Sequence, residues 1–408
     1  MVLLLKRQQF YFYRKLNMMS ELSVFFASLD KEKISDGVGY SEQMLGHIIQ
    51  GNFSDFPDLD GIELALIGVN ESRRSSGNSA SCHAPDEVRK YFYRLYQGSF
   101  SAKIADLGNI VAGNTVEDTY YALSQSLDYL IRKNIIPIIL GGSHDLTYAQ
   151  FLGYEKLEQT INVVTVDATF DLGSPDDDFS SKSFLGKIIL HQPNYLFNYS
   201  NIGYQTYLVS QSQLQMMNKL YFDVYRLGQV RDNILETEPI IRHADFLSFD
   251  ISAIKHSDAP AHPEASPNGF YAEEACQMMW YAGMNDKLTS VGIYELNPEL
   301  DLFGKSTHLA AQMVWCFIDG FYGRKRDYPS RSSNDYTRFH VFLQDNQYEI
   351  NFYKSKKSDR WWMEVPYPSQ KGLKFERHTL VPCSYKDYET ACKDEIPDRW
   401  WQTYQKLS

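Results

Sequence analysis

Short apolar runs, rich in β-branched residues, recur through the middle of the chain and predict buried strands. These runs lie at residues 63–68, 135–140, 163–166, 244–250 and 288–295. Segments with the apolar spacing of a helix lie between and after them, at residues 84–89, 115–131, 271–284 and 308–322. Strands that alternate with helices imply right-handed βαβ units. We therefore predict a three-layer α/β/α fold around a central, mostly parallel sheet.

The pattern changes on both sides of this region. Residues 19–58 are polar and only weakly helical, with a helix-like segment at 21–29. The insert at 173–205 is loop-rich, and a short strand is predicted at 207–209. After about Arg324 the spacing predicts antiparallel strands at 338–343, 348–353 and 361–365. We expect three parts, namely an N-terminal extension (1–58), an α/β domain (59–325) and a small β-rich, aromatic-rich appendage (326–408).

Polar residues follow the predicted strands where each one ends. They are His144, Asp167, Asp171, Asp250 and Glu295. Taken singly, the acids read equally well as solvated turn residues or caps, and a His after two glycines is more often structural. The carboxyl ends of parallel strands, however, open onto one crevice. One imidazole with several carboxylates makes a site suited to Mn²⁺, with Mg²⁺ or Zn²⁺ as alternatives.

Four motifs in this order resemble those of the ureohydrolases, which include arginase, agmatinase and formimidoylglutamase. The motifs are Gly141-Gly-Ser-His144, Asp167-Ala-Thr-Phe-Asp171, Ser248-Phe-Asp-Ile-Ser252 and Glu295-Leu-Asn-Pro298. The family patterns are GGxH, DAHxD, SxDxD and E-x-NP, and the resemblance spans roughly residues 60–325. The presence of an acid, Asp145, directly after this histidine resembles the formimidoylglutamase branch of the family more than arginase. The resemblance implies the arginase-like α/β fold.

The resemblance also implies a metal site, because two Mn²⁺ ions in that family share a hydroxide that attacks the amidine or guanidine carbon. The first ion would be held by His144, Asp167, Asp171 and Asp250. The second would share Asp167 and Asp250 and would need the histidine of DAHxD and the second aspartate of SxDxD. Those two positions are Thr169 and Ser252 here. Hydroxyls replace imidazole and carboxylate poorly, so one ion is expected.

Two residues are expected to take part in the reaction on the same ground. They are Asp171 and Glu295, and Glu295 matches the family acid that faces the cationic end of the substrate. The alternative interpretation of Glu295 is an acid at the end of a strand that caps the next turn. Lys255 could supply a nearby cation, although an exposed loop lysine is the more usual reading. The sequence therefore predicts a hydrolase of linear amidine or guanidino C–N bonds. The alternative is a catalytically silent homologue that binds a ligand or a partner.

The composition of the chain indicates which classes of partner the protein binds and in which compartment it is expected. The 408-residue chain carries a net charge of −11, which argues against general nucleic-acid binding. Its five cysteines are scattered without zinc-like spacing, which favours a reduced, cytoplasmic protein. Met1–Leu5 is too short for a membrane span, and residues 1–17 are expected to precede a start at Met18 or Met19. The expected partner is a small amidine or guanidino substrate, with no membrane, and the resemblance favours a homo-oligomer.

Overall fold

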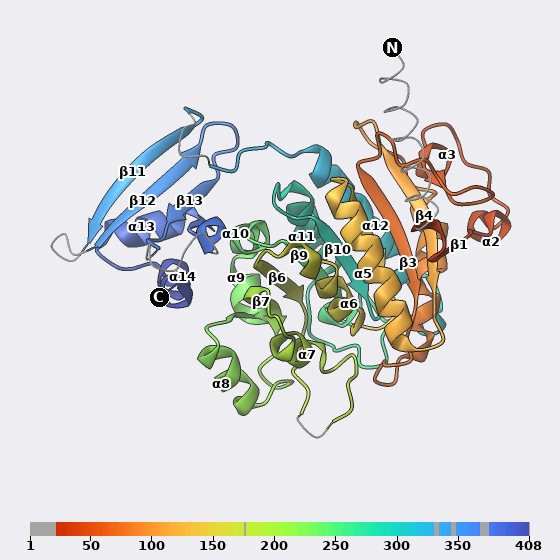
Figure 1. Ribbon diagram of the computed structural model, residues 1–408, viewed down its shortest axis with the longest axis horizontal. Helices are drawn as coiled ribbons and strands as arrows, with labels where there is room; N and C mark the ends of the chain where they lie inside the picture. Colours follow the sequence, from red (N-terminus) through yellow and green to blue (C-terminus); the bar gives the residue numbers. More distant parts are fainter. Residues whose placement is uncertain (1–21, 175–176, 330–333, 344–347, 368–374, 408) are drawn as a thin grey trace, which may run out of the picture.

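A large mostly parallel sheet forms the centre of the protein. The computed structural model describes residues 22–174, 177–329, 334–343, 348–367 and 375–407. The strand order is β1-β4-β3-β5-β10-β9-β6-β7-β8, with β2 beside β4 (Figure 1). Among the described strands of this sheet, only the β1–β4 pair is antiparallel. The strands are β1 (Phe26–Ala27), β2 (Gln50–Gly51), β3 (Leu64–Asn70), β4 (Ile104–Val111), β5 (Ile136–Leu140), β6 (Ile161–Val166), β7 (Leu196–Tyr204), β8 (Asp223–Arg226), β9 (Phe246–Asp250) and β10 (Ser290–Tyr294).

Helices cover both faces of this sheet. Along β3, Leu64 and Leu66 enter one hydrophobic core, whereas Ala65, Ile67 and Val69 enter another. Side chains of a strand point alternately to opposite faces, so the two cores are the two sides of the sheet. One side packs against α4 (Ala84–Phe92), α10 (Thr237–Arg242), α11 (Ala272–Met284) and α12 (Lys305–Tyr322), and the other against α5 (Val116–Arg132), α6 (Leu146–Leu152) and α7 (Phe184–Leu190). The predicted three-layer α/β/α fold is confirmed.

The described N-terminal segment is packed onto this sheet. The helix expected at 21–29 is wrong over most of its length, because β1 pairs with β4 there. Pairing with an existing edge strand outweighs a weak helical tendency. The helices α2 (Lys31–Ser35) and α3 (Leu45–Ile48) follow, and both contribute to the core. Residues 1–17, with the alternative starts Met18 and Met19, lie outside the described residues.

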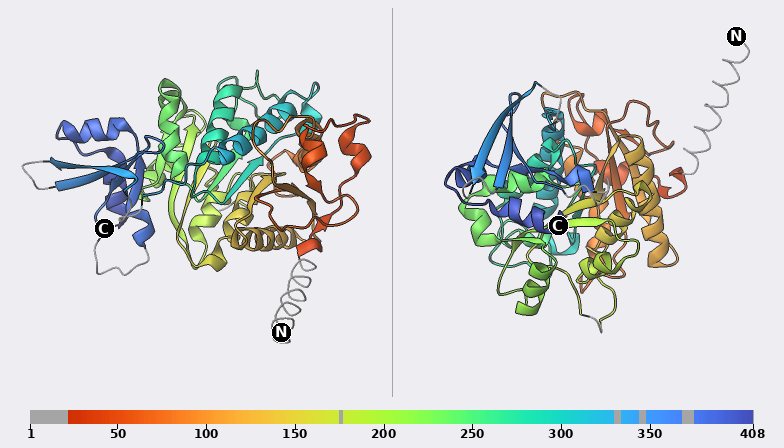
Figure 2. Two further views of the ribbon diagram at one scale, coloured as in Figure 1. Left: turned by 90° about the horizontal axis from the view of Figure 1, so that it is seen from above. Right: turned by 60° about the vertical axis from the view of Figure 1, so that its left-hand side comes forward.

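A second, antiparallel sheet stands at the other end of the molecule (Figures 1 and 2). Its strand order is β11-β12-β13-β14, and it has a hydrophobic core of its own. Arg242 of α10 joins the two parts by donating to the carbonyls of Trp361 and Cys383. The elements of this C-terminal part are β11 (Tyr336–Leu343), β12 (Tyr348–Ser355), β13 (Trp361–Glu364), β14 (Leu380–Cys383), α13 (Tyr385–Cys392) and α14 (Asp398–Leu407).

The region between β6 and β9 is more regular than the sequence suggested. The segment expected to be a loop-rich insert, 173–205, contains α7 and β7, and the strand predicted at 207–209 is a turn. The polar residues Asn198, Ser200 and Asn201 are buried within β7 and conceal its strand pattern. The helices α8 (Gln211–Lys219) and α9 (Leu227–Asp232) complete this region. No helix in the described part of the chain is long and apolar enough to cross a membrane.

Candidate metal centre

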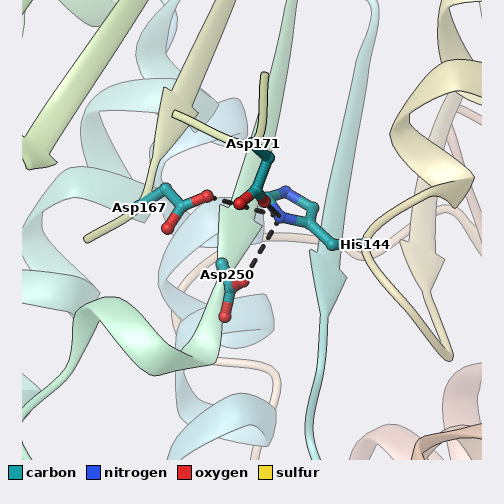
Figure 3. A group of neighbouring side chains, drawn as sticks. All are labelled: His144, Asp167, Asp171 and Asp250. Atoms are coloured by element: carbon teal, nitrogen blue, oxygen red, sulfur yellow. Dashed lines mark hydrogen bonds and ion pairs between the residues drawn. The ribbon is translucent and has the colours of Figure 1, made fainter. Parts of the chain in front are cut away.

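Four side chains from the ends of neighbouring strands converge in one buried cluster. His144 follows β5, Asp167 and Asp171 follow β6, and Asp250 is the last residue of β9. Each residue offers one ligand atom, and these atoms all lie within 4.8 Å of one another. The side chains point toward a common centre (Figure 3). The parallel sheet thus brings together residues that lie up to about a hundred positions apart in the sequence.

The imidazole of His144 is held between the acids on one side and hydroxyls on the other. Its Nδ1 atom lies 3.1 Å from Asp171, 3.2 Å from Asp250 and 3.4 Å from Asp167, in each case from Oδ2. Its Nε2 atom lies 2.9 Å from the hydroxyl of Ser248, which lies 2.6 Å from the hydroxyl of Thr147. A proton on Nε2, donated to Ser248, would leave the Nδ1 lone pair free to bind a metal ion.

The charges of this cluster are unbalanced without a cation. Burial, together with Asp171 and Asp250, raises the pKa of Asp167 well above its usual value. Burial alone would lower the pKa of His144, but its hydrogen bonds to Asp171 and Asp250 raise it well above the usual range. The Oδ2 atom of Asp167 is buried and accepts no hydrogen bond from any residue that the structure describes. The cluster offers one nitrogen and three carboxylate oxygens, and the Asp167 oxygen lacks a hydrogen-bond donor. This ligand set fits one divalent ion such as Mn²⁺.

Two hydroxyl residues stand beside this cluster and bind the acids. The backbone N–H of Thr169 donates to Asp167 Oδ1 at 2.9 Å, and its hydroxyl donates to Asp171 Oδ1 at 2.7 Å. The backbone N–H of Ser252 donates to Asp250 Oδ1 at 2.7 Å. These contacts orient three of the four cluster residues. They also occupy carboxylate oxygens on the side where the resemblance would put a second ion.

Glu295 lies behind His144 rather than among the four convergent side chains. Its Oε1 atom accepts the backbone N–H of His144 at 2.7 Å, and its Oε2 atom accepts from Asn78 at 2.7 Å. The side chain is buried, and burial followed by the charge of Asp250 raises its pKa to about 7. Its φ angle of +65° is in the left-handed region, a costly conformation for a residue with a side chain. The hydrogen bonds offset that cost and hold the His144 backbone in place.

Sequence reasoning missed the lysine that shares a cavity wall with Asp171. Lys255 is held elsewhere, 3.6 Å from Asp258 and 3.5 Å above the ring of Tyr271. Lys182 instead lines a cavity of about 410 Å³ together with Thr169 and Asp171. Lys182 lies in the short loop just before α7, within the segment that the sequence described only as a loop-rich insert. Asn78, which binds Glu295, was also missed, because a residue so far away in the sequence carries no local signal.

Known proteins resemble this chain over the region that contains the cluster. A family model described as "Arginase family" matches residues 62–319, which is more than half of the chain. The formimidoylglutamase of Bacillus subtilis (strain 168) is 23% identical over 279 residues, covering 63% of this chain and 86% of that protein. The formimidoylglutamase of Staphylococcus haemolyticus is 25% identical over 277 residues, covering 65% and 88%.

Solved structures share the fold at low sequence identity. Trypanosoma cruzi formiminoglutamase with Mn²⁺ superimposes with a TM-score of 0.63 and 19% identity, covering 69% of this chain and 99% of that one. The agmatine ureohydrolase of Thermoplasma volcanium gives 0.56 and 19%, covering 74% and 99%. The matched family region contains the whole strand-end cluster and stops before the C-terminal sheet. The chain belongs to the arginase family of the ureohydrolase superfamily.

Proposed function

We propose that this protein is a hydrolase of linear amidine C–N bonds, of the formimidoylglutamase type, that works with one divalent ion. The observation that carries this proposal is the set of four buried ligand atoms within 4.8 Å, contributed by His144, Asp167, Asp171 and Asp250. The curated relatives named formimidoylglutamase support the substrate class. The Mn²⁺-containing Trypanosoma cruzi formiminoglutamase supports the choice of ion.

The residues around the cluster divide the work of holding the ion and meeting the substrate. A bound divalent ion would supply Lewis acidity, which lowers the pKa of water and polarises the amidine. Ser248 fixes the tautomer and direction of the His144 ring. Asp171 both belongs to the ligand set and lines the cavity of about 410 Å³. We assign Asp171 the contact between the centre and the substrate.

Glu295 is assigned a role beside the centre. The resemblance to ureohydrolases suggests that it faces the cationic end of the substrate. Its hydrogen bonds to the His144 backbone and to Asn78 support a positioning role in addition. Glu295→Gln should therefore lower turnover and weaken metal binding together. A change in KM alone would restrict Glu295 to substrate contact.

A catalytically silent homologue is the second candidate. It is favoured by Thr169 and Ser252, whose contacts with Asp167, Asp171 and Asp250 leave fewer carboxylate oxygens for a second ion. One cation lowers the pKa of a water molecule less than two. Under this alternative the crevice retains ligand or metal binding without turnover. The C-terminal sheet would then provide an interaction surface.

Metal analysis followed by a substrate panel tests the proposal. The full chain, produced with Mn²⁺, should contain about one ion per chain. It should release formamide, ammonia or urea from one member of a panel of linear amidines and guanidines, and a chelator should abolish that release. Gln213→Ala, at the cavity wall, is the control that retains the ion. Bound metal without turnover would favour the silent homologue, and a chain that binds no divalent ion would overturn the proposal.

A further inference from the structure

The cavity beside the metal centre is lined by the residues that separate this chain from a two-ion site. Its wall includes Thr169, Asp171, Ser252 and Lys182. Lys182 is the one lysine or arginine in that wall as the described residues define it. A single basic side chain therefore faces the same space as the two hydroxyl residues.

The loop that carries Lys182 is fixed on both sides of it. The backbone N–H of Ser181 donates to the carbonyl of Arg74 at 2.9 Å, and its hydroxyl accepts from Ser76 at 3.1 Å. The hydroxyl of Ser183 accepts the backbone N–H of Ser180 at 2.8 Å. In the helix that follows, Leu185 donates its N–H to the carbonyl of Asp171 at 3.1 Å. The helix directly after the loop is therefore bound to a residue of the metal centre.

The charge of Lys182 is maintained by the acids of the centre. Burial alone would lower the pKa of its ammonium, but Asp171, Asp250 and Asp167 raise that pKa well above the usual value. Glu264 also binds Lys182 at 3.0 Å, but its side chain is 63% exposed. Water screens an exposed partner strongly. The buried acids therefore act on Lys182 together with Glu264, its direct ion-pair partner.

Two other basic side chains near the centre, those of His262 and Lys255, do not supply this charge. Burial lowers the pKa of His262 below its ordinary value, so this ring is neutral at physiological pH. Lys255 is bound to Asp258 and Tyr271. Three ligand carboxylates carry three negative charges, of which one divalent ion neutralises two. Lys182 supplies the third positive charge, so that one ion with one ammonium balances the ligand set.

We propose that Lys182 supplies, as a fixed ammonium, the positive charge that a second divalent ion would otherwise bring, so that the centre holds a single ion. This inference rests on metal binding as set out under the proposed function. It joins three residues in one arrangement: relative to the family motifs, Ser252 lacks a carboxylate and Thr169 lacks an imidazole, and Lys182 brings a cation to the same cavity. A second ion would have to approach against the charge of this ammonium.

Charge-removing variants test this inference through metal affinity. Lys182→Met retains the length of the side chain, Lys182→Arg retains the charge, and Lys187→Met alters the next lysine along, which lies above Tyr148 and Phe179. Calorimetric titration should show Mn²⁺ binding at least ~10-fold tighter in Lys182→Met, because a neighbouring positive charge no longer opposes the ion. Lys182→Arg and Lys187→Met should match the parent. Unchanged affinity in Lys182→Met would overturn the inference.

Stoichiometry gives a second readout on the same centre. With Lys182 present, Thr169→His with Ser252→Asp should still bind one ion. The same pair combined with Lys182→Met should bind two. Two ions in the double variant would contradict the blocking role of Lys182, and one ion in the triple variant would show that its charge is not what excludes the second ion.

Melting in the presence of a chelator separates this inference from the proposed function. If the parent binds no Mn²⁺, the proposed function is wrong, yet Lys182 would still be, beside His144, a counter-charge of the buried acids. Lys182→Met should then melt lower than the parent by ~2 °C or more, and Lys187→Met should not. Equal melting temperatures for all three metal-free proteins would overturn the charge role of Lys182.

Discussion

The strand β9 runs between two buried aspartates whose surroundings are opposite. Asp245, just before the strand, receives the Asn162 N–H at 2.7 Å and lies 2.5 Å from Arg377 and 3.2 Å from Lys287. Asp250, at the other end, faces His144 and two further carboxylates. The protein supplies the cations for Asp245, whereas the cluster around Asp250 needs one from solution. This contrast distinguishes an acid that joins two parts of the fold from one that binds a ligand.

The ion pairs of Asp245 with Arg377 and Lys287 form a junction between the C-terminal sheet region and the central sheet. Arg377 lies between β13 and β14, and Lys287 lies just before β10. Burial lowers the pKa of Lys287 to about 8, although Asp245 opposes that shift. A buried ion pair of this kind costs desolvation free energy and repays it only while both partners are present. The two ends of β9 should therefore respond differently to the same substitution.

The largest expected effect is the loss of the ion in Asp250→Ala. This variant should bind no Mn²⁺ and should lose all amidine hydrolysis. At Mn²⁺ about 100 times its dissociation constant, binding stabilises the folded state by about 2.7 kcal/mol, and the variant should lose all of this. With chelator, the loss should be much smaller, because relief of the repulsion between carboxylates opposes the loss of the contact between Asp250 and His144. Equal destabilisation with and without chelator would instead make Asp250 a structural acid like Asp245.

The substitution Asp245→Asn should destabilise the protein whether or not metal is present. It leaves the charges of Arg377 and Lys287 near the junction without their partner. Breaking a buried ion pair costs roughly 3–5 kcal/mol, and we expect roughly 2–3 kcal/mol because Arg377 is 31% exposed. Denaturant unfolding with Mn²⁺ and with chelator measures this loss. A loss seen only with Mn²⁺ would remove the distinction between the two ends of β9.

A smaller effect is expected at Ser248, which contacts the metal-binding ring from behind. Ser248→Ala removes the acceptor at 2.9 Å from His144 Nε2 and should weaken Mn²⁺ binding roughly 10–100-fold. Ser290→Ala is a matched control, because Ser290 is a buried strand serine that binds Gln150 and Tyr154 away from the ligand set. Equal affinities for both variants would show that the Ser248 contact does not position the ring.

The smallest expected effect is a pH dependence of the metal-free protein. The pKa of His144 is raised above its ordinary value of 6.5 by Asp171 and Asp250, against the effect of burial. The stability gained from this group is therefore complete below about pH 6.5 and is lost as pH rises through the folded-state value. Melting of the chelated protein should fall as pH rises above 6.5, by at most about 1.4 kcal/mol per pH unit. Mn²⁺ should reduce this slope, and a slope unchanged in His144→Asn would assign it to another group.

How much of the molecule the sequence predicts depends on how local the signal is. The strand β6 is a continuous run of apolar and β-branched residues, so its position and the acids beyond it follow from the pattern. The strand β7 was missed because Asn198, Ser200 and Asn201 are buried by contacts that no local pattern reports. The pairing of Asp245 with Arg377 joins residues 132 positions apart, which only the fold reveals.

The same reasoning explains the candidate site. His144, Asp167, Asp171 and Asp250 end strands of one parallel sheet, and topology alone brings strand ends together. Lys182 comes from a loop whose path depends on contacts with Arg74, Ser76 and Asp171. The sequence offered Lys255 as a cation near the acids, with an exposed loop lysine as the favoured interpretation, and a loop without periodicity gave no sign of Lys182.

The number of ions at the centre tests the account most directly. Crystals of the full chain soaked in Mn²⁺ and measured at the manganese absorption edge would locate each ion by its anomalous scattering. We predict one peak per chain, surrounded by His144 Nδ1 and the carboxylates of Asp167, Asp171 and Asp250. Two peaks roughly 3.5–4 Å apart, the spacing of two-metal sites, would contradict the account.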